Sequence, residues 1–325
     1  MPSIAFMIRN VLVHPPVPTA SFQDKTVIVT GGNTGLGLEA ARRLIQLGAA
    51  KVILACRSLD KGAAAALDIQ TTTQCSPQRI EAWKLDMSSY ASVQEFASRA
   101  STELPRLDAL IANAGVARLQ FAVTEDNEET ITTNVVSTAL LGFMLHPKLR
   151  ETAAKFGTQT HFTIVGSELY ADAKFKESKV PAGEIFATLN DEKKSVMADR
   201  YNVSKLLNYF IANQMALLSP LESSGVVVNC VAPGFCKSGL MGDYPRILVR
   251  LMHVLARPTE VGSRNLVLGA SGQSETHGRY VSDAKVENTM RALAGGVQGQ
   301  DLQKRVWGEL KEKLEVIRPG VTNLV

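Results

Sequence analysis

The feature that most limits what this chain can fold into is a glycine-rich turn at residues 30–37, Thr-Gly-Gly-Asn-Thr-Gly-Leu-Gly. The turn follows an apolar run at residues 26–30 and opens a helical pattern at residues 36–47. Glycine lets the backbone adopt positive φ and approach a ligand without an intervening Cβ. The unpaired N–H groups at the start of the helix attract phosphate. This order of strand, turn and helix predicts a dinucleotide site, and a tight turn that binds nothing is the alternative. The candidate binding residues are Gly31, Asn33, Thr34, Gly35, Leu36 and Gly37.

Short β-branched runs alternate with longer helical patterns along the rest of the chain, which is typical of a parallel sheet covered by helices on both faces. All-apolar runs such as residues 27–29 and 52–55 fit central strands that are buried on both faces. The sequence therefore predicts an α/β fold, a single doubly wound domain with about seven parallel strands. Strands are expected at residues 26–30, 51–56, 79–84, 109–112, 161–165, 226–231 and 279–282, and helices at residues 36–47, 92–103, 129–145 and 201–218.

The predicted catalytic domain spans residues 23–290, and the alternation of strands and helices is interrupted twice, at residues 168–200 and 235–278. Insertions in such folds usually lie beyond the carboxyl ends of strands, where ligands bind. Residues 1–22 are expected to form an N-terminal extension and residues 291–325 a C-terminal helical extension. Trp307, Leu310 and Leu314 share the apolar side of the helix expected there.

Composition excludes several classes of function. Of the 325 residues, 45% are hydrophobic and 20% charged, which is ordinary for a globular protein. A net charge of +4 without any basic block argues against nucleic acid. The four cysteines and five histidines show no metal-ligand spacing, and we expect reduced cysteines in a cytoplasmic protein.

An apolar run at residues 3–13 precedes a Pro-rich stretch at residues 14–18. The run is too short to span a bilayer, so no transmembrane segment is expected. It also lacks the charged start and cleavage site of a signal peptide. We expect a short helix packed on the body of the protein; an interfacial anchor that gives weak membrane association is the alternative.

The residues after the second expected strand bear on which dinucleotide is bound. An acid at this position would accept hydrogen bonds from the ribose 2′-hydroxyl of NAD. The position instead falls at Arg57, whose guanidinium suits a 2′-phosphate, and Lys61 lies one helical turn further on. Asp60 is interpreted as a residue of the helix start. NADP(H) is therefore favoured over NAD(H), with a solvent-facing role for Arg57 as the alternative.

Tyr201 and Lys205 lie four residues apart, on one face of an expected helix. An ammonium close to a phenol favours the phenolate, which suits the pair to acid–base chemistry near neutral pH. Alone, this spacing is common on helix surfaces. Together with the glycine turn, and with Asn113-Ala114-Gly115 after an apolar run, it resembles the short-chain dehydrogenase/reductase family over roughly residues 24–285.

This resemblance implies a Rossmann fold and a set of further cofactor contacts. Asp86 and Met87 would lie at the adenine. The segment Asn113, Ala114 and Gly115 would steady the sheet beside the adenine ribose. Near the nicotinamide the resemblance places Pro233, Gly234 and Ser238, and it implies that Tyr201 and Lys205 also contact the cofactor.

The resemblance also implies the catalytic roles. Ser167 would hydrogen-bond the substrate oxygen, Tyr201 would give or take its proton, and Lys205 would hold the ribose. Asn134 would steady a proton relay through water; a plain polar helix residue is the alternative. Gly166 stands where the family more often has a second serine, a mild departure that leaves the essential hydroxyl in place.

The distance between Ser167 and Tyr201, 34 positions, is longer than is usual in the family. The extra segment resembles that of retinol dehydrogenase-like reductases and of fungal enzymes of secondary metabolism, which implies a roomy, hydrophobic substrate site. We therefore expect an NADPH-dependent oxidoreductase, a carbonyl reductase of a ketone or aldehyde on a hydrophobic small molecule, or the reverse alcohol oxidation. An NADP-binding scaffold without redox activity and a membrane-associated lipid or retinoid enzyme are the alternatives. A homo-oligomer is compatible with the sequence.

Overall fold

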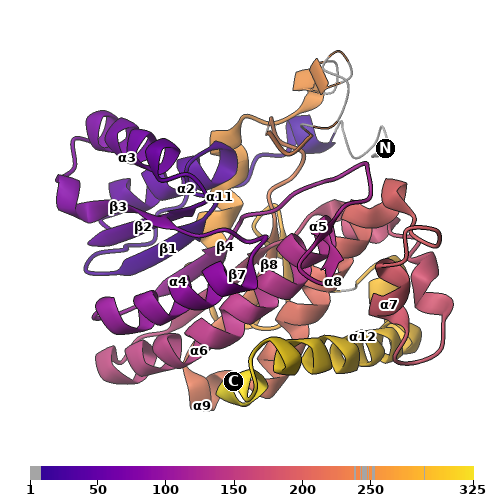
Figure 1. Ribbon diagram of the computed structural model, residues 1–325. Helices are drawn as coiled ribbons and strands as arrows, with labels where there is room; N and C mark the ends of the chain where they lie inside the picture. The colour runs from indigo at the N-terminus through magenta and orange to yellow at the C-terminus, as the bar shows by residue number, and fades with distance from the viewer. Residues whose placement is uncertain are drawn as a thin grey trace.

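An eight-stranded sheet forms the centre of the molecule in the computed structural model (Figure 1). The structure describes residues 9–237, 239–241, 243, 247, 249–250, 253–288 and 290–325. The strand order is β10-β9-β8-β7-β4-β1-β2-β3, and every neighbouring pair is parallel except β9 and β10. The order reverses between β1 and β4, as in a doubly wound fold. The strands are β1 Thr26–Thr30, β2 Lys51–Cys56, β3 Ile80–Lys84, β4 Ala109–Ala112, β7 Thr160–Val165, β8 Val226–Ala232, β9 Tyr280–Ser282 and β10 Lys285–Val286.

The predicted fold class and all seven predicted strands are confirmed. The eighth strand, β10, was not expected. It has two residues, one exposed and one partly buried, and it pairs antiparallel to β9 at the edge of the sheet. A segment this short carries no hydrophobic period from which it could be predicted. A separate two-stranded hairpin, β5 Val123–Thr124 and β6 Asn127–Glu128, was also not expected, because its strands are equally short.

The sheet divides the core into two layers because successive side chains of a strand point to opposite faces. Val27 and Val29 pack on one side with helices α2, α3 and α11, and Ile28 packs on the other side with α4, α6 and α8 (Figure 1). All three side chains are fully buried, as the apolar run predicts for a central parallel strand. The longer helices are α2 Gly35–Gln46, α3 Leu59–Thr73, α4 Tyr90–Glu103, α6 Ser137–Phe156, α8 Met197–Leu218, α11 Thr259–Gly269 and α12 Gly296–Ile317.

The helix predicted at residues 129–145 is divided in the structure. A short helix, α5 Glu129–Ile131, leads into one π-helical turn, Thr132–Val136, and α6 follows. A π turn inserts one extra residue into a helix and changes the direction of the side chains around it. Helix α6 also continues through the exposed Pro147, beyond the predicted end at residue 145.

The first insertion and the C-terminal helix pack against the helices on one face of the sheet. Residues 168–200 form 3₁₀ turns and a short helix, α7 Ile185–Leu189, against α8. Helix α12 packs against α7 and α8, and its Trp307 stacks on Phe143 of α6 with ring centroids 5.7 Å apart. Leu310 and Leu314 are fully buried, which confirms the predicted apolar side of this helix.

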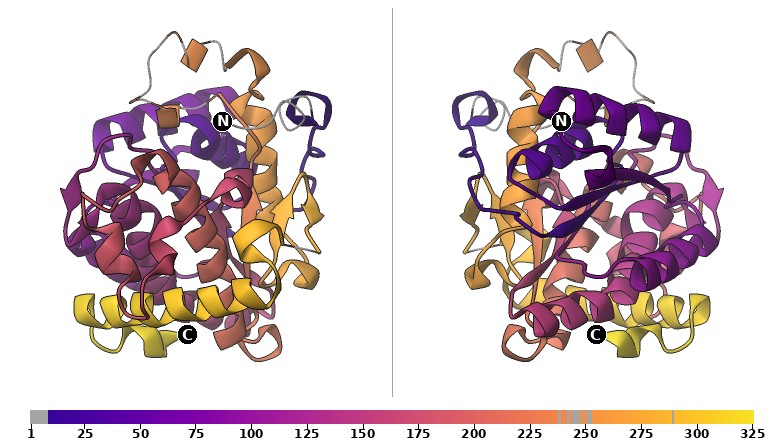
Figure 2. Two further views of the ribbon diagram at one scale, coloured as in Figure 1. Left: turned by 90° about the vertical axis from the view of Figure 1, so that its right-hand side faces the viewer. Right: turned by 90° about the vertical axis from the view of Figure 1, so that its left-hand side faces the viewer.

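The N-terminal segment lies against the loop that follows β8 (Figure 2). Residues 9–12 are helical, and the Asn10 amide donates to the carbonyl oxygens of Phe235 and Leu255. The earlier part of the predicted N-terminal helix, residues 1–8, lies outside the described residues. Within the described part of the chain, no helix combines the length and the apolar character that crossing a membrane would need.

Candidate active site

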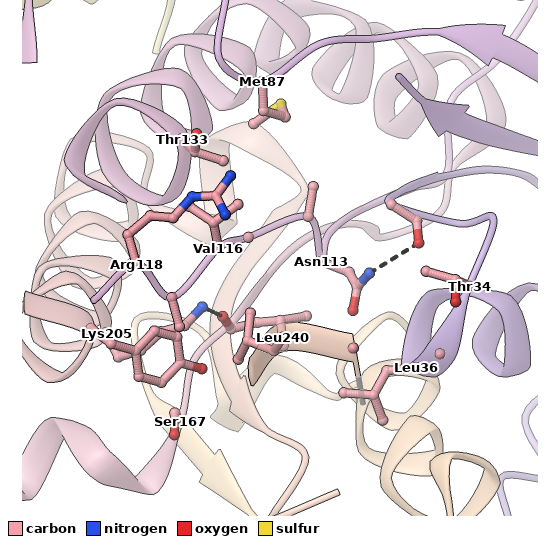
Figure 3. A pocket seen from close by; sticks show the side chains of 18 of the residues that line it. Thr34, Leu36, Met87, Asn113, Val116, Arg118, Thr133, Ser167, Lys205 and Leu240 are labelled. Atoms are coloured by element: carbon pink, nitrogen blue, oxygen red, sulfur yellow. Dashed lines mark hydrogen bonds between the residues drawn. The ribbon is translucent and has the colours of Figure 1, made fainter. Parts of the chain in front are cut away.

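A cavity of about 780 Å³ opens at the carboxyl ends of β1, β2, β4, β7 and β8 (Figure 3). Most of the predicted site residues line it, although they come from segments far apart in the chain. Two do not: Gly37 lies behind the glycine turn, and Asn134 lies buried beneath the loop after β4. Ser238 lies outside the described residues. Lining residues that the sequence predicts are Gly31, Asn33, Thr34, Gly35, Leu36, Arg57, Lys61, Asp86, Met87, Asn113, Ala114, Gly115, Ser167, Tyr201, Lys205, Pro233 and Gly234.

The glycine turn has the conformation that its sequence predicts. Gly31 and Gly35 adopt positive φ, +64° and +58°. A Cβ on Gly37 would come within 2.5 Å of the carbonyl oxygen of Gly31, so this glycine permits the tight packing of α2 against the turn. Thr34, Gly35 and Leu36, at the start of α2, face the cavity. The turn thus brings a helix N-terminus to the cavity, which suits the binding of a phosphate.

Asn113 braces the glycine turn against β4. Its side-chain amide donates to the carbonyl oxygen of Thr30 at 2.9 Å. The hydroxyl of Thr30 in turn accepts from the backbone N–H groups of Asn113 and Ala114. Because these bonds join β1 and β4, they fix the switch point of the sheet, which is where a doubly wound fold binds its ligand.

Positively charged side chains line the cavity at the carboxyl end of β2. Arg57 and Lys61 line the cavity with exposed side chains, and the Lys84 ammonium donates to the backbone oxygen of Arg57 at 2.7 Å. Ser58 caps α3 by accepting from the N–H of Lys61. Asp60 lies in the first turn of this helix, where it was placed by interpretation of the sequence. The position that would meet the ribose 2′ group is therefore cationic.

Asp86 shapes the turn beside the expected adenine position. Its carboxylate accepts from the N–H and the hydroxyl of Ser88, at 3.0 and 2.6 Å. Its own N–H donates to Ser92 near the start of α4. These bonds hold Asp86 and Met87 at the wall of the cavity.

Asn134 lies in the π turn, and its side chain supports the loop that lines the cavity. Its carbonyl oxygen accepts from the N–H of Val116 at 2.8 Å, and its amide donates to the Val116 oxygen and to the hydroxyl of Ser204. Asn134 thereby links the loop after β4 to α8, which carries Tyr201 and Lys205. Nothing in the sequence marks a π turn, so this geometry could not have been predicted.

Lys205, Tyr201 and Ser167 meet at one end of the cavity (Figure 3 labels Lys205 and Ser167). The ammonium of Lys205 lies 5.6 Å from the centre of the Tyr201 ring and donates to the carbonyl oxygen of Val165 at 2.8 Å. Burial lowers the pKa of Lys205 to about 8. The Ser167 hydroxyl, at the end of β7, accepts from the N–H of Leu169.

The structure explains the departure at Gly166. A Cβ at this position would lie 2.7 Å from the sulfur of Cys230, which projects from the neighbouring strand β8. A serine at residue 166 would therefore require a smaller residue at 230. The departure is a packing change beneath the site and leaves Ser167 facing the cavity.

Both predicted insertions contribute side chains to the wall of the cavity, in the part expected to hold the substrate. The first supplies Leu169 and Met197, and the second supplies Phe235 and Leu240. These side chains add apolar surface, and the first insertion also brings the carboxylates of Glu168 and Asp172 to the cavity. Arg118 also lines the cavity, although sequence reasoning missed it (Figure 3).

The guanidinium of Arg118 binds the carboxylate of Glu129 through two hydrogen bonds, at 2.8 and 2.7 Å, and lies 3.2 Å from Asp243. No motif marks this Arg in the sequence. Its charge is met by two carboxylates, so it does not act as a lone cation at the substrate end.

The comparisons with known proteins agree with this geometry. A family model described as short chain dehydrogenase matches residues 25–157. The short chain dehydrogenase/reductase dmxR8 of Cryptosporiopsis sp. is 46% identical over 323 residues, which cover 98% of this chain and 99% of the relative. The chain belongs to the short-chain dehydrogenase/reductase family. The predicted resemblance is thereby confirmed.

Another member of this family, the short-chain dehydrogenase anuD of Penicillium roqueforti, is 37% identical over 332 residues, covering 99% of this chain and 85% of the relative. Both relatives come from fungi, in agreement with the resemblance to fungal enzymes. Among solved structures, the NADPH-bound carbonyl reductase from chicken fatty liver has a TM-score of 0.60 and 20% identity over 83% of this chain and 96% of its own. The Pseudomonas aeruginosa RhlG/NADP complex has a TM-score of 0.61 and 22% identity, covering 82% and 96%. These two structures share the fold.

Proposed function

We propose that this oxidoreductase is NADPH-dependent and reduces a ketone or aldehyde on a hydrophobic small molecule, or oxidises the corresponding alcohol. The observation that carries the proposal is that Ser167, Tyr201 and Lys205 line one cavity, which Arg57 and Lys61 also line at the carboxyl end of β2. The fungal relatives and the resemblance to enzymes of secondary metabolism favour a secondary metabolite as the substrate.

The cationic residues at the carboxyl end of β2 fit NADP(H). Arg57 and Lys61 offer charge-assisted hydrogen bonds to a 2′-phosphate, and the turn after β2 carries no acid for a ribose 2′-hydroxyl. Gly37 permits the close approach of α2 to the turn, so that the helix start can meet a pyrophosphate. Asn113 and Ala114 also line the cavity.

The proposed mechanism divides the transfer of hydrogen between cofactor and protein. NADPH, when bound, supplies the hydride to the carbonyl carbon. The Ser167 hydroxyl donates a hydrogen bond to the carbonyl oxygen, which orients it toward Tyr201. The Tyr201 hydroxyl then gives its proton to that oxygen as negative charge develops there.

Lys205 supports this step from behind. An ammonium has three N–H donors, and one is committed to Val165. The remaining two can bind the ribose hydroxyls of the cofactor, while the positive charge stabilises the tyrosinate left after proton transfer. The apolar side chains of Leu169, Met197 and Leu240 exclude water from the reacting atoms.

The test is a screen of hydrophobic carbonyl compounds, with nicotinamide absorbance and product measured together. One NADPH consumed for each alcohol formed supports the proposal. A non-redox scaffold would form product without that loss of NADPH, and this result would contradict the proposal.

A further inference from the structure

Arg200 directly precedes Tyr201, and its side chain is completely buried. Two buried carboxylates face it: Arg200 Nε lies 3.4 Å from Glu128 Oε2, and a terminal nitrogen lies 3.6 Å from Glu177 Oε1. The same terminal nitrogen donates to the carbonyl oxygen of Leu189 and to the hydroxyl of Ser195. We call Arg200, Glu128 and Glu177 the Arg200 cluster.

Stability alone does not account for the Arg200 cluster. Within the described part of the chain, Nε and the second terminal nitrogen of Arg200 make no hydrogen bond. Burial also lowers the pKa of Arg200 and raises that of Glu128, because both charges have left water. Well-packed apolar residues of similar volume are often at least as stable as a buried ion pair. A cluster that is costly and incompletely hydrogen-bonded calls for another explanation.

Glu128 connects the cluster to the segment that carries Asn134. Its carboxylate accepts from the N–H and hydroxyl of Thr130 and from the N–H of Ile131, and so caps the start of α5. Helix α5 runs directly into the π turn that contains Asn134. The carboxylate that faces Arg200 therefore also fixes the start of the Asn134 segment.

Arg200 connects the cluster to the catalytic helix α8. It lies in the first turns of α8, one residue before Tyr201, and α5 lies beside this part of α8 (Figure 1). A second link between the two segments is the hydrogen bond from Asn134 to Ser204 at 3.0 Å. These two links join α8 to the Asn134 segment on either side of Tyr201.

Glu177 has a different connection. It belongs to the insertion at residues 168–200, and its Oε1 also accepts from the N–H of Val196 within the same insertion. Asn190, another residue of the insertion, accepts from the N–H of Glu128 at 2.9 Å. The insertion thus encloses the pair formed by Arg200 and Glu128 and keeps it from water.

We propose that Arg200 and Glu128 are positioning residues that hold the Asn134 segment and Tyr201 in fixed register, and that the insertion at residues 168–200 serves to bury this pair. This inference rests on the proposed function, because it assigns Tyr201 the proton transfer. It gives the long segment between Ser167 and Tyr201 a role in catalysis besides lining the substrate end of the cavity.

The test compares Glu128→Gln with the matched control Glu177→Gln. Each variant removes one carboxylate charge from Arg200, but only Glu128 caps α5. Glutamine at residue 128 retains one oxygen, which can accept the two bonds from Thr130; the bond from the Ile131 N–H goes to the other carboxylate oxygen and is lost. Steady-state rates, the solvent deuterium isotope effect on kcat, NADPH affinity and melting temperature are measured for both variants and for Arg200→Met.

We expect Glu128→Gln and Arg200→Met to lower kcat by roughly 10- to 100-fold, because small misplacement of a catalytic group has effects of this size. The affinity of both variants for NADPH should change less than about twofold, because a lower kcat with retained ground-state binding is what misplacement of a proton donor produces. The solvent isotope effect should rise, since proton delivery from Tyr201 becomes slower. Glu177→Gln should lower the melting temperature and leave kcat and the isotope effect unchanged.

The inference is overturned if Glu128→Gln keeps the wild-type kcat and isotope effect, or if Glu177→Gln changes both equally. Should Arg200→Met fail to fold, Glu128→Gln decides the matter. If Tyr201→Phe retains activity, the proposed function itself fails. If Tyr201→Phe is inactive while Glu128→Gln behaves as wild type, the inference alone fails.

Discussion

Replacing Arg57 with alanine is expected to weaken the binding of NADPH and to leave the binding of NADH almost unchanged. Arg57 lies after β2 with an exposed side chain at the wall of the cavity, and Lys61 lines the same end. The Lys84 ammonium fixes the Arg57 backbone through its carbonyl oxygen. Because the backbone is held independently, the substitution removes the guanidinium with little effect on the turn.

The size of the effect follows from the exposure of the site. Hydrogen bonds to charged groups contribute about 1.5–3 kcal/mol. Since Arg57 is exposed, water and salt screen its charge and the lower part of this range applies. A loss of about 1.5–2 kcal/mol corresponds to roughly 10- to 30-fold weaker binding of NADPH. Lys61→Ala removes a single ammonium further along the wall and should cost only about threefold.

The assay is fluorescence titration with NADPH and with NADH, at low and at high salt. Lys304→Ala is the matched control, because it removes one exposed positive charge from α12, away from the cavity. High salt should narrow the difference between wild type and Arg57→Ala, since it screens the exposed pair. Equal weakening of both cofactors by Arg57→Ala, or a wild-type protein that prefers NADH, would refute the assignment of the 2′-phosphate to Arg57.

Three further predictions concern the turn, the buried lysine and the C-terminal helix. Gly37→Ala places a Cβ within 2.5 Å of the Gly31 oxygen, so it should destabilise the protein by about 1–3 kcal/mol and weaken NADPH binding. Gly308→Ala is the control, because its Cβ would meet no atom within 4 Å, and it should change neither property. Urea unfolding and titration with NADPH measure the two effects. Burial lowers the pKa of Lys205 to about 8, against about 10.4 in an unfolded chain. Below pH 8 the charged ammonium therefore lowers the free energy of unfolding by about 3 kcal/mol relative to a neutral side chain. Between pH 8 and 10.4 the unfolded chain binds more protons than the folded one, so the free energy of unfolding of wild type should rise by about 3 kcal/mol relative to that of Lys205→Met. Urea unfolding without cofactor measures both values, and a difference that does not change with pH would contradict the burial of the charge. Glu309→Gln should lower the free energy of unfolding by about 1–2 kcal/mol, because the carboxylate accepts hydrogen bonds from three backbone N–H groups at and before the start of α7. An unchanged free energy of unfolding would show that these bonds contribute nothing.

The parts of the fold that sequence predicts are those set by local chemistry. The glycine turn, the buried parallel strands and the pairing of Tyr201 with Lys205 on one helix each follow from a pattern within a few residues. Arg57 after β2 is likewise marked by its position relative to the glycine turn and the second strand. The family resemblance then relates these separate patterns to one cavity, and the structure brings nearly all of those residues to it.

The rest depends on contacts between distant segments. The π turn that holds Asn134 has no sequence signal, and Gly166 is explained only by the sulfur of Cys230 on the next strand. Arg118 takes its place at the substrate end through Glu129 and a residue 125 positions later in the chain. Arg200 is buried against Glu177, Leu189 and Ser195, which all belong to the insertion and which no local pattern relates to Arg200.

The central claim, that Tyr201 transfers the proton during NADPH-dependent carbonyl reduction, is tested most directly by Tyr201→Phe. The measurement pairs single-turnover oxidation of NADPH, with a substrate that wild type reduces, with NADPH binding under the same conditions. Phenylalanine keeps the ring and removes only the hydroxyl, so turnover should fall by at least about 100-fold while NADPH binds as in wild type. Turnover by Tyr201→Phe at the wild-type rate would contradict the account.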